Sequence, residues 1–233
     1  MRAKFIRNVF ENDNTVSFYF QPEADFSWIA GQYTEIHLPH DKVDSRGTQR
    51  LFTITNLSED GFVSIATRTN GQASSYKRKL LNLQPGDMVT MSEPMGDFIL
   101  PRDATIPLVF VAGGIGITPF VSIFRDLYAR EQQRDIHFLY ALHTEADIIF
   151  QDTYTKASIH TTVFVSEPSH EWSGERGRLT GDRVLKTSAP SPHALFYLSG
   201  PERMIETLQK ELLSLGIEQR QIVTDFFHGY EPV

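Results

Sequence analysis

Three glycines within four residues follow the most apolar run of the chain. Residues 109–112 (Val-Phe-Val-Ala) lead into Gly113-Gly114-Ile115-Gly116, and Thr118-Pro119 then opens a helix-periodic segment. Thr118 suits the N-cap of that helix and Pro119 its first position, where the missing N–H costs nothing. A strand, a tight turn and a helix N-terminus would present backbone N–H groups to a phosphate. The sequence therefore predicts a phosphate-binding turn, although its spacing departs from G-x-G-x-x-G.

The segment Arg50-Leu51-Phe52-Thr53 combines side chains suited to a phosphorylated ring compound. In an ideal strand, Arg50 and Phe52 share one face, and Leu51 and Thr53 share the other. Arginine offers a planar fork to a phosphate, phenylalanine a flat surface to a ring, and threonine a hydroxyl to a heteroatom. An ordinary strand with one solvated arginine is the alternative.

A third segment, Gly71-Gln72-Ala73-Ser74-Ser75, precedes a helix-periodic run. The hydroxyls of Ser74 and Ser75, with nearby N–H groups, could hold a phosphate. A plain helix N-cap is the alternative at this position.

The elements around these segments change character along the chain. Residues 3–100 predict an antiparallel barrel or sandwich of short strands separated by turn residues. The strands expected there are 15–20, 34–38, 51–55, 62–68 and 88–92, with one helix at 74–81.

Residues 107–233 instead alternate apolar strands with helical patterns, which predicts a parallel sheet with crossover helices. The strands expected there are 108–112, 137–141, 162–165, 194–198 and 222–224, with helices from 120, near 147–157 and from 202. The boundary falls near residues 101–105, giving domains 1–101 and 106–233.

Composition narrows the possible partners. The chain has 233 residues, a formal net charge of −7, no cysteine and eight histidines. The negative charge disfavours nucleic acid and anionic membranes, and no apolar run approaches the ~20 residues of a membrane span. The histidines lack metal-ligand spacing, so no metal site is expected. The N-terminus has no apolar signal core, and a cytoplasmic location is compatible with the absence of cysteine.

Several short motifs occur in a fixed order along nearly the whole chain. They are Gly31-Gln32-Tyr33, Arg50-x-Phe52-Thr53, Gly71-x-x-Ser74, Pro85-Gly86-Asp87, Gly113-Gly-x-Gly-x-Thr-Pro119 and Ser199-Gly200-Pro201. This order resembles the ferredoxin–NADP reductase family of flavoproteins. The resemblance implies an N-terminal Greek-key flavin-binding barrel followed by a C-terminal nicotinamide-nucleotide domain with a parallel sheet. It also implies hydride transfer from NAD(P)H to a bound flavin.

The resemblance assigns flavin contacts in the first domain. Arg50 would bind the flavin phosphate, Phe52 would lie against the isoalloxazine, and Thr53 would contact the redox-active end of the ring. The rest of the implied cradle comprises Leu51, Ala66, Thr67, Arg68, Gly71, Ser74 and Ser75. FAD is preferred over FMN, because most stand-alone members use it.

The resemblance also assigns nucleotide contacts in the second domain. The diphosphate site would comprise Gly113, Gly114, Gly116 and Thr118, and the late strand–turn–helix contributes Ser199, Gly200, Pro201 and Met204. Ser199 replaces a cysteine usual beside the nicotinamide, which leaves hydride transfer plausible. Asp225 occupies the acidic position of a C-terminal E-x-[FY] motif. Phe227 occupies its aromatic position, with Tyr230 as a rival.

The choice of nucleotide depends on Ser166-Glu167. Plant-type members place Ser-Arg there, and that arginine binds the 2′-phosphate. A glutamate repels this phosphate and accepts hydrogen bonds from ribose hydroxyls, which favours NADH. Arg176 and Arg178 lie nearby in sequence and leave the preference open.

The implied enzyme is an NAD(P)H-dependent flavoprotein reductase with catalytic residues Thr53, Ser199 and Asp225. Its acceptor must be external, because no cysteine is present to ligate an iron–sulfur cluster. A ferredoxin, a flavodoxin, an oxygenase component or a small molecule would serve. The alternatives are an NAD(P)H:free-flavin reductase and a non-catalytic nucleotide-binding redox sensor.

Overall fold

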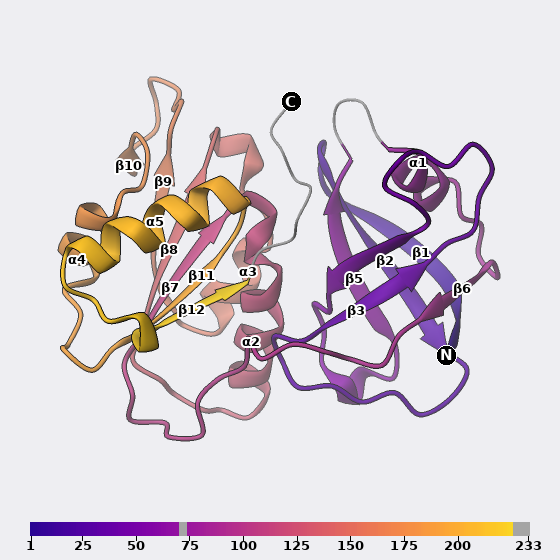
Figure 1. The fold of residues 1–233 in the computed structure, drawn as a ribbon, viewed down its shortest axis with the longest axis horizontal. Helices are drawn as coiled ribbons and strands as arrows, with labels where there is room; N and C mark the ends of the chain where they lie inside the picture. The colour runs from indigo at the N-terminus through magenta and orange to yellow at the C-terminus, as the bar shows by residue number, and fades with distance from the viewer. Residues whose placement is uncertain (70–73, 226–233) are drawn as a thin grey trace. The chain divides into compact units, whose positions relative to one another are not determined.

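The computed structural model describes residues 1–69 and 74–225. The chain divides into two compact units, Met1–Ile99 and Leu100–Val233 (Figure 1). The first contains an antiparallel sheet and the second a parallel sheet with helices, so the predicted fold class is confirmed.

Six antiparallel strands form the sheet of the first unit in the order β4-β3-β6-β1-β2-β5. They are β1 (Arg2–Asn12), β2 (Thr15–Pro22), β3 (Tyr33–His37), β4 (Gln49–Thr53), β5 (Val63–Arg68) and β6 (Met88–Met91). A bridge between Ile54 and Ile65 joins the two edge strands, so the sheet closes into a barrel. Helix α1 (Ser75–Leu81) contributes Tyr76 and Leu80 to the barrel core.

Strand β1 is the one strand of the barrel that the turn-and-alternation pattern did not lead us to expect. Its pairing with β2 is irregular between Phe5 and Arg7 and again between Phe10 and Asn12. Each bulge shifts the side-chain alternation by one residue. Ala3 and Phe5 are buried, but Ile6 and Arg7 are both exposed in succession, so no single period of two runs along the strand.

The sheet of the second unit is parallel throughout, in the order β10-β9-β8-β7-β11-β12. Its strands are β7 (Leu108–Gly113), β8 (Ile136–Leu142), β9 (His160–Val165), β10 (Glu175–Arg176), β11 (Leu195–Ser199) and β12 (Ile222–Asp225). The chain runs from β7 through β8 to β9 on one side, and β11 and β12 lie on the other side of β7. The order therefore reverses between β7 and β11, where α/β sheets bind ligands at the carboxyl ends of their strands.

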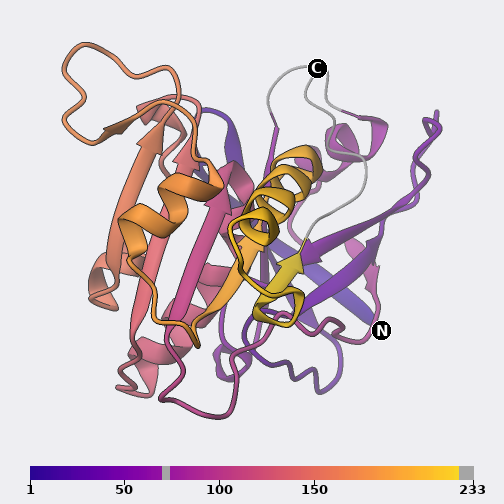
Figure 2. The ribbon, with the colours of Figure 1, turned by 60° about the vertical axis from the view of Figure 1, so that its left-hand side comes forward.

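Helices cover both faces of this sheet, as Figure 2 shows. Helices α4 (Gly181–Ser188) and α5 (Glu202–Ser214) share a core with Val109 and Val111 of β7. The alternate residue Phe110 faces α2 (Thr118–Ala129), with its ring centroid 4.8 Å from that of Phe120. Helix α3 (Gln151–Lys156) lies on this second face. Successive side chains of β7 thus point into apolar layers on opposite faces of the sheet. Both faces of the strand are covered by helices, which is why the strand is apolar throughout.

Three local details differ from the expectations. Helix α2 continues directly from a 3₁₀ helix, Gly114–Ile117, so Ile117 is its N-cap and the prediction for Thr118 was wrong. The helix expected near 147–157 is divided, because Phe150 adopts a left-handed φ of 56° immediately before α3. Helix α4 was not predicted, since its eight residues carry few apolar side chains.

Candidate cofactor-binding sites

The glycine turn after β7 packs backbone to backbone against the turn after β11. A Cβ at Gly116 would collide with the carbonyl oxygen of Ser199 and lie 2.5 Å from the Cα of Gly200. A Cβ at Gly200 would lie 3.0 Å from the Cα of Gly113. These glycines bring the carboxyl ends of β7 and β11 together at the switch point of the sheet.

The rest of the glycine turn has the character of an anion-binding turn. Gly114 has a φ of 51°, in the left-handed region that glycine adopts without strain, and its backbone is half-buried. The turn leads into α2, whose positive dipole end lies here. Thr118 is 4% exposed and donates from Oγ1 to the carbonyl of Ile115 at 3.1 Å, so its side chain supports the turn from inside.

The turn after β11 holds a buried hydroxyl that lacks a partner. Ser199 is fully buried, and its Oγ finds no hydrogen-bond partner among the described residues. Leaving such a group unpaired costs about 1–3 kcal/mol, which a bound ligand would recover. Pro201 and Met204 pack against Gly113, where a Cβ would lie 2.9 Å from Pro201 Cδ and 2.5 Å from Met204 Sδ.

Asp225 ends the neighbouring strand β12 and pairs in register with Ser199. Burial raises the pKa of its carboxyl group to about 7. The side chain can therefore hold or release a proton near neutral pH, as a general acid or base requires. The sequence pointed to Asp225 only through the C-terminal motif. That Asp225 lies beside Ser199 is known only from the pairing of β11 with β12.

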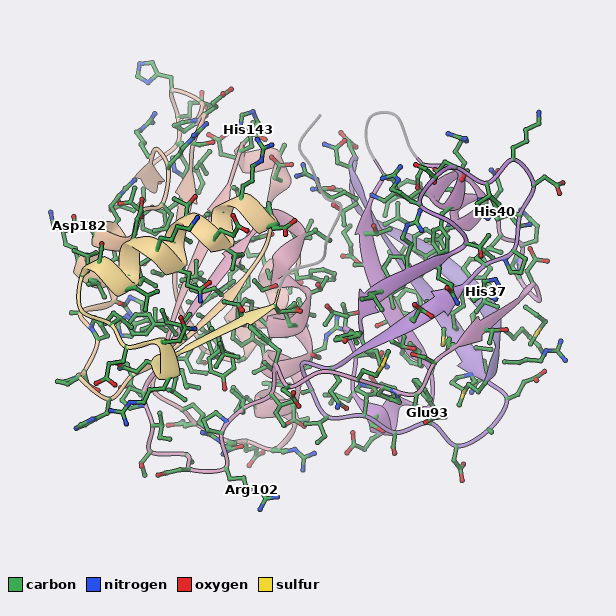
Figure 3. The ribbon with its side chains drawn as sticks, viewed as in Figure 1. His37, His40, Glu93, Arg102, His143 and Asp182 are labelled. Carbon is green, nitrogen blue, oxygen red and sulfur yellow. The ribbon has the colours of Figure 1, made fainter. Side chains whose placement is uncertain are left out.

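The predicted ribose residues lie at the carboxyl end of β9, together with a histidine that follows β8. His143 contacts Ser166 through Nδ1 (3.2 Å to Oγ) and Glu167 through Nε2 (3.4 Å to Oε2), and Figure 3 labels it. The side chains of His143 and Glu167 are both well exposed. From the sequence, His143 was expected to be a structural or surface residue, because its contact with residues 166 and 167 arises only from strand pairing.

The guanidinium of Arg176 is hydrogen-bonded to backbone carbonyls of the loop before β10. Its Nη2 donates to the carbonyls of His170, at 3.1 Å, and Trp172, at 2.5 Å. These bonds hold Arg176 in place, which weakens the case for it as the partner of a 2′-phosphate. Arg178 also lies past the end of β10, and its carbonyl accepts from Arg183 at 3.0 Å.

In the first unit, four cationic side chains come together: Arg46, Arg50, Arg68 and Lys77, here called the cationic cluster. Burial, followed by repulsion from Arg46, Arg68 and Arg50, lowers the pKa of Lys77 to about 8. Arg50 and Arg68 were predicted as flavin contacts. Arg46 and Lys77 were missed, although Lys77 lies three residues after the expected phosphate residue Ser74.

Arg50 has hydrogen-bonding capacity left for an anion. Its Nη1 donates to the carbonyls of Arg46 (2.6 Å), Gly47 (3.2 Å) and Gln49 (2.6 Å). Its Nη2 is buried, has no hydrogen bond to any residue that the structure describes, and lies 3.7 Å from a carboxylate oxygen of Asp44. A phosphate oxygen is the kind of charged acceptor that this nitrogen could bind.

Asp44 is the acidic member of this region. The N–H of Ser75 donates to Asp44 Oδ2 at 2.9 Å and that of Arg46 to Oδ1 at 3.0 Å. The Ser75 N–H bond is the main cause that lowers the pKa of Asp44 to about 2. Ser75 Oγ in turn accepts from the N–H of Asp44 at 3.0 Å and lies 2.9 Å from Nε2 of His40 (Figure 3).

Ser74 and Ser75 both make hydrogen bonds within the protein at the position where a phosphate was expected. Ser74 is the N-cap of α1, where its Oγ accepts from the N–H of Lys77 at 3.2 Å. The N-cap alternative thus describes Ser74, and Ser75 is bonded to Asp44. Their contact with a flavin phosphate stays a prediction.

Strand β4 presents its residues differently from an ideal alternation. Leu51 is 40% exposed, whereas Phe52 and Thr53 are both buried. Phe52 belongs to the barrel core, 6.0 Å from the ring of Tyr76, so its contact with a flavin ring stays a prediction. Thr53 Oγ1 has no hydrogen-bond partner among the described residues, as at Ser199.

The remaining predicted flavin residues end strand β5. Ala66 and Thr67 are buried, and Arg68 is half-buried. Gly71 and Phe227 lie outside the described residues.

Comparisons with known proteins show which families and solved structures the chain is similar to. Residues 110–210 match the family model of the oxidoreductase NAD-binding domain. The chain is 27% identical to a flavohemoprotein of Bacillus cereus over 95% of its length, and spans 59% of that relative. The structure matches the flavohem-like FAD/NAD binding domain of a Vibrio cholerae nitric oxide dioxygenase with a TM-score of 0.83, at 22% identity, covering 97% and 98% of the two chains.

A ferredoxin NADP⁺ reductase from Neisseria gonorrhoeae, solved with FAD and NADP, matches with a TM-score of 0.80 at 16% identity. This match covers 97% of this chain and 98% of that one. The fold is therefore that of the ferredoxin–NADP reductase-like flavoproteins, which confirms the resemblance seen in the sequence. Within this fold, residues 110–210 match the model of the oxidoreductase NAD-binding domain, which lies in the second unit.

None of the helices among the described residues is both long and apolar enough to cross a membrane. Within residues 1–69 and 74–225, no three His, Cys, Asp or Glu side chains group as metal ligands would.

Proposed function

We propose that the chain is an NAD(P)H-dependent flavoprotein reductase that takes a hydride from the nicotinamide and passes electrons to an external acceptor. The observation that carries this proposal is the cationic cluster. The charges of Arg46, Arg50 and Arg68 all act on Lys77 in a chain of net charge −7, and the carboxylate paired with both Arg46 and Arg50 is that of Asp44. A local excess of positive charge of this kind is expected for binding a phosphorylated ligand. A flavin phosphate fits the unbonded Nη2 of Arg50.

When bound, the flavin supplies the redox chemistry, and the protein contributes positioning and electrostatics. Thr53 and Ser199 each hold a buried hydroxyl that has no partner within residues 1–69 and 74–225, so each has a hydrogen bond to give to a ligand. Asp225 is suited to hold a proton, because its pKa is raised to about 7. The catalytic roles of these three residues are part of the proposal.

The nucleotide would bind at the switch point between β7 and β11, with its diphosphate at Gly113, Gly114 and Gly116. The Glu167 carboxylate would disfavour a 2′-phosphate, so we expect NADH to be preferred. His143 lies 3.4 Å from this carboxylate and would hold it beside the ribose.

The acceptor is proposed to be a small redox protein or an oxygenase component. The chain spans about 59% of the length of its curated relatives. Structural neighbours include a cytochrome P450 reductase from Amycolatopsis and the ferredoxin reductase in carbazole 1,9a-dioxygenase. Both neighbours are named as reductases, and this supports a proposed acceptor that is a separate protein or component.

One observation favours the alternative of an NAD(P)H:free-flavin reductase. Asp44 already bonds to Ser75 and lies beside Arg50, which would weaken retention of the flavin. Gel filtration separates the two, because a prosthetic flavin remains with the protein and a substrate flavin does not.

The test of the proposed function is the absorption spectrum of the purified protein, followed by anaerobic titration with NADH and NADPH. We expect a flavin spectrum that bleaches on titration, with less NADH than NADPH required. A protein that binds flavin but is not reduced by either nucleotide would be the redox sensor instead.

A further inference from the structure

The carboxylate of Asp44 occupies the position in the first unit where an anionic ligand is expected. It accepts from the N–H groups of Ser75 and Arg46 and lies 3.7 Å from both the Arg50 and Arg46 guanidinium groups. We propose that the carboxylate of Asp44 competes with the flavin phosphate for the same donors, and that it must move away from them when flavin binds. This inference rests on the proposed function, and it identifies Asp44 as the residue that lowers the affinity of the protein for flavin.

Competition follows from the donors that the two anions share. A phosphate bound to Nη2 of Arg50 would lie beside the Asp44 carboxylate, because that nitrogen is 3.7 Å from Asp44 Oδ1. Two like charges at such a separation repel each other. The phosphate would also draw on the Ser75 N–H, which Asp44 holds. Both cannot be fully bonded at once.

Asp44 can leave without disturbing the barrel core. It lies in the segment between β3 and β4, where the side chain of Val43 is 45% exposed and those of Asp41 and Lys42 are also exposed. Asp44 itself keeps 31% of its side-chain surface. Its displacement therefore breaks polar contacts and uncovers little apolar surface.

If Asp44 instead held the Arg50 guanidinium in place for the ligand, removing it would weaken binding. The contacts of Arg50 do not support this role. Arg50 is fixed by three carbonyls through Nη1, and none of these carbonyls belongs to Asp44. The nearest contact of Asp44 with Arg50, at 3.7 Å, is an ion pair without a hydrogen bond. Removing the carboxylate should therefore leave the guanidinium in place and free it for a ligand.

The test compares Asp44→Asn with wild type, using Asp41→Asn as the control on the same segment. The asparagine keeps an amide oxygen for the Ser75 N–H, and Asp44→Ser serves as a second variant if the first fails to fold. We expect the dissociation constant of FAD, measured by fluorescence titration of flavin-free protein, to fall about tenfold or more in Asp44→Asn. Asp41→Asn should match wild type. An equal or larger dissociation constant in Asp44→Asn overturns the inference.

A second measurement separates this inference from the proposed function, because its probe is inorganic pyrophosphate. Pyrophosphate should raise the melting temperature of flavin-free Asp44→Asn more than that of wild type, since a ligand stabilises the state it binds. Equal shifts in the two proteins would rule out competition. A larger shift in the variant, with no flavin bound by either protein, would keep the competition and overturn the flavin function.

Discussion

Ser199 and Asp225 are register partners at the carboxyl ends of the adjacent parallel strands β11 and β12. Ser199 carries a buried hydroxyl that has no partner in the part of the chain that the structure describes, and Asp225 carries a carboxyl group whose pKa is raised to about 7. This end of the sheet therefore contains both a hydrogen-bonding group and a titrating group that ligand-free protein does not fully satisfy.

The raised pKa of Asp225 predicts a loss of stability as pH rises. In the unfolded chain this carboxyl ionises near pH 4, whereas burial keeps it protonated in the folded chain up to about pH 7. The folded state binds the extra proton between these values, so stability is lost as pH rises through that window. From pH 5 to pH 8, flavin-free wild type should lose on the order of 1–3 kcal/mol more than Asp225→Asn, as measured by urea unfolding. Asp182→Asn, an exposed control labelled in Figure 3, should follow wild type; a parallel profile for Asp225→Asn would contradict the assignment.

Arg50→Ala should weaken flavin binding. Charge-assisted hydrogen bonds contribute roughly 1.5–3 kcal/mol, so the dissociation constant should rise about 10- to 150-fold. Fluorescence titration of flavin-free protein measures this change. Arg102→Ala removes an exposed arginine from the second unit and should leave the constant unchanged (Figure 3). Full flavin occupancy in purified Arg50→Ala would show that the phosphate binds elsewhere.

Thr53→Val should slow reduction of the flavin without impairing folding. Valine keeps the shape of the side chain and removes a buried hydroxyl that has no partner, so the flavin-free protein should be at least as stable as wild type. Reduction by saturating NADH should slow about tenfold for each ~1.4 kcal/mol of lost transition-state stabilisation. Anaerobic stopped-flow at the flavin band measures the rate. In the same assay Ser199→Cys should be as fast as wild type or faster, and an unchanged rate in Thr53→Val would remove that residue from the site.

Glu167→Arg should shift the choice of nucleotide. The change replaces a repulsive carboxylate with a partner for the 2′-phosphate and breaks the contact with His143. The ratio of kcat/KM for NADPH to that for NADH should rise about 10- to 100-fold, equivalent to about 1.4–2.8 kcal/mol. Glu171→Arg adds the same charge to an exposed position on the same loop and should leave the ratio near that of wild type. If both variants raise it equally, the effect is one of general charge, and Arg178 becomes the next residue to test.

The parts that could be predicted from the sequence are those encoded by neighbouring residues. Strand β7 and its turn follow from an apolar run and the glycines after it, and α1 follows from Ser74 as its cap. Strand β1 was missed because its bulges break the period on which the prediction depends.

The missed parts of the candidate sites arise from contacts between distant residues. Asp44 meets the N–H of Ser75 across 31 positions of the chain, and His143 meets Ser166 across 23. No local pattern records such pairs, since they form only when the segment before β4 lies against α1 or when β8 pairs with β9.

The close approach of Gly200 to Gly113 has a consequence for the order of assembly. The two turns belong to strands that are distant in the chain, so the switch-point crevice cannot form until β11 has paired with β7. Such non-local parallel pairing forms slowly compared with local helices and hairpins. During synthesis, the glycine turn would emerge well before its partner, and a chain interrupted ahead of β11 would keep α2 while lacking this crevice. Recovery of nucleotide binding should therefore lag behind recovery of helical circular dichroism during refolding, and the lag would time the docking of β11.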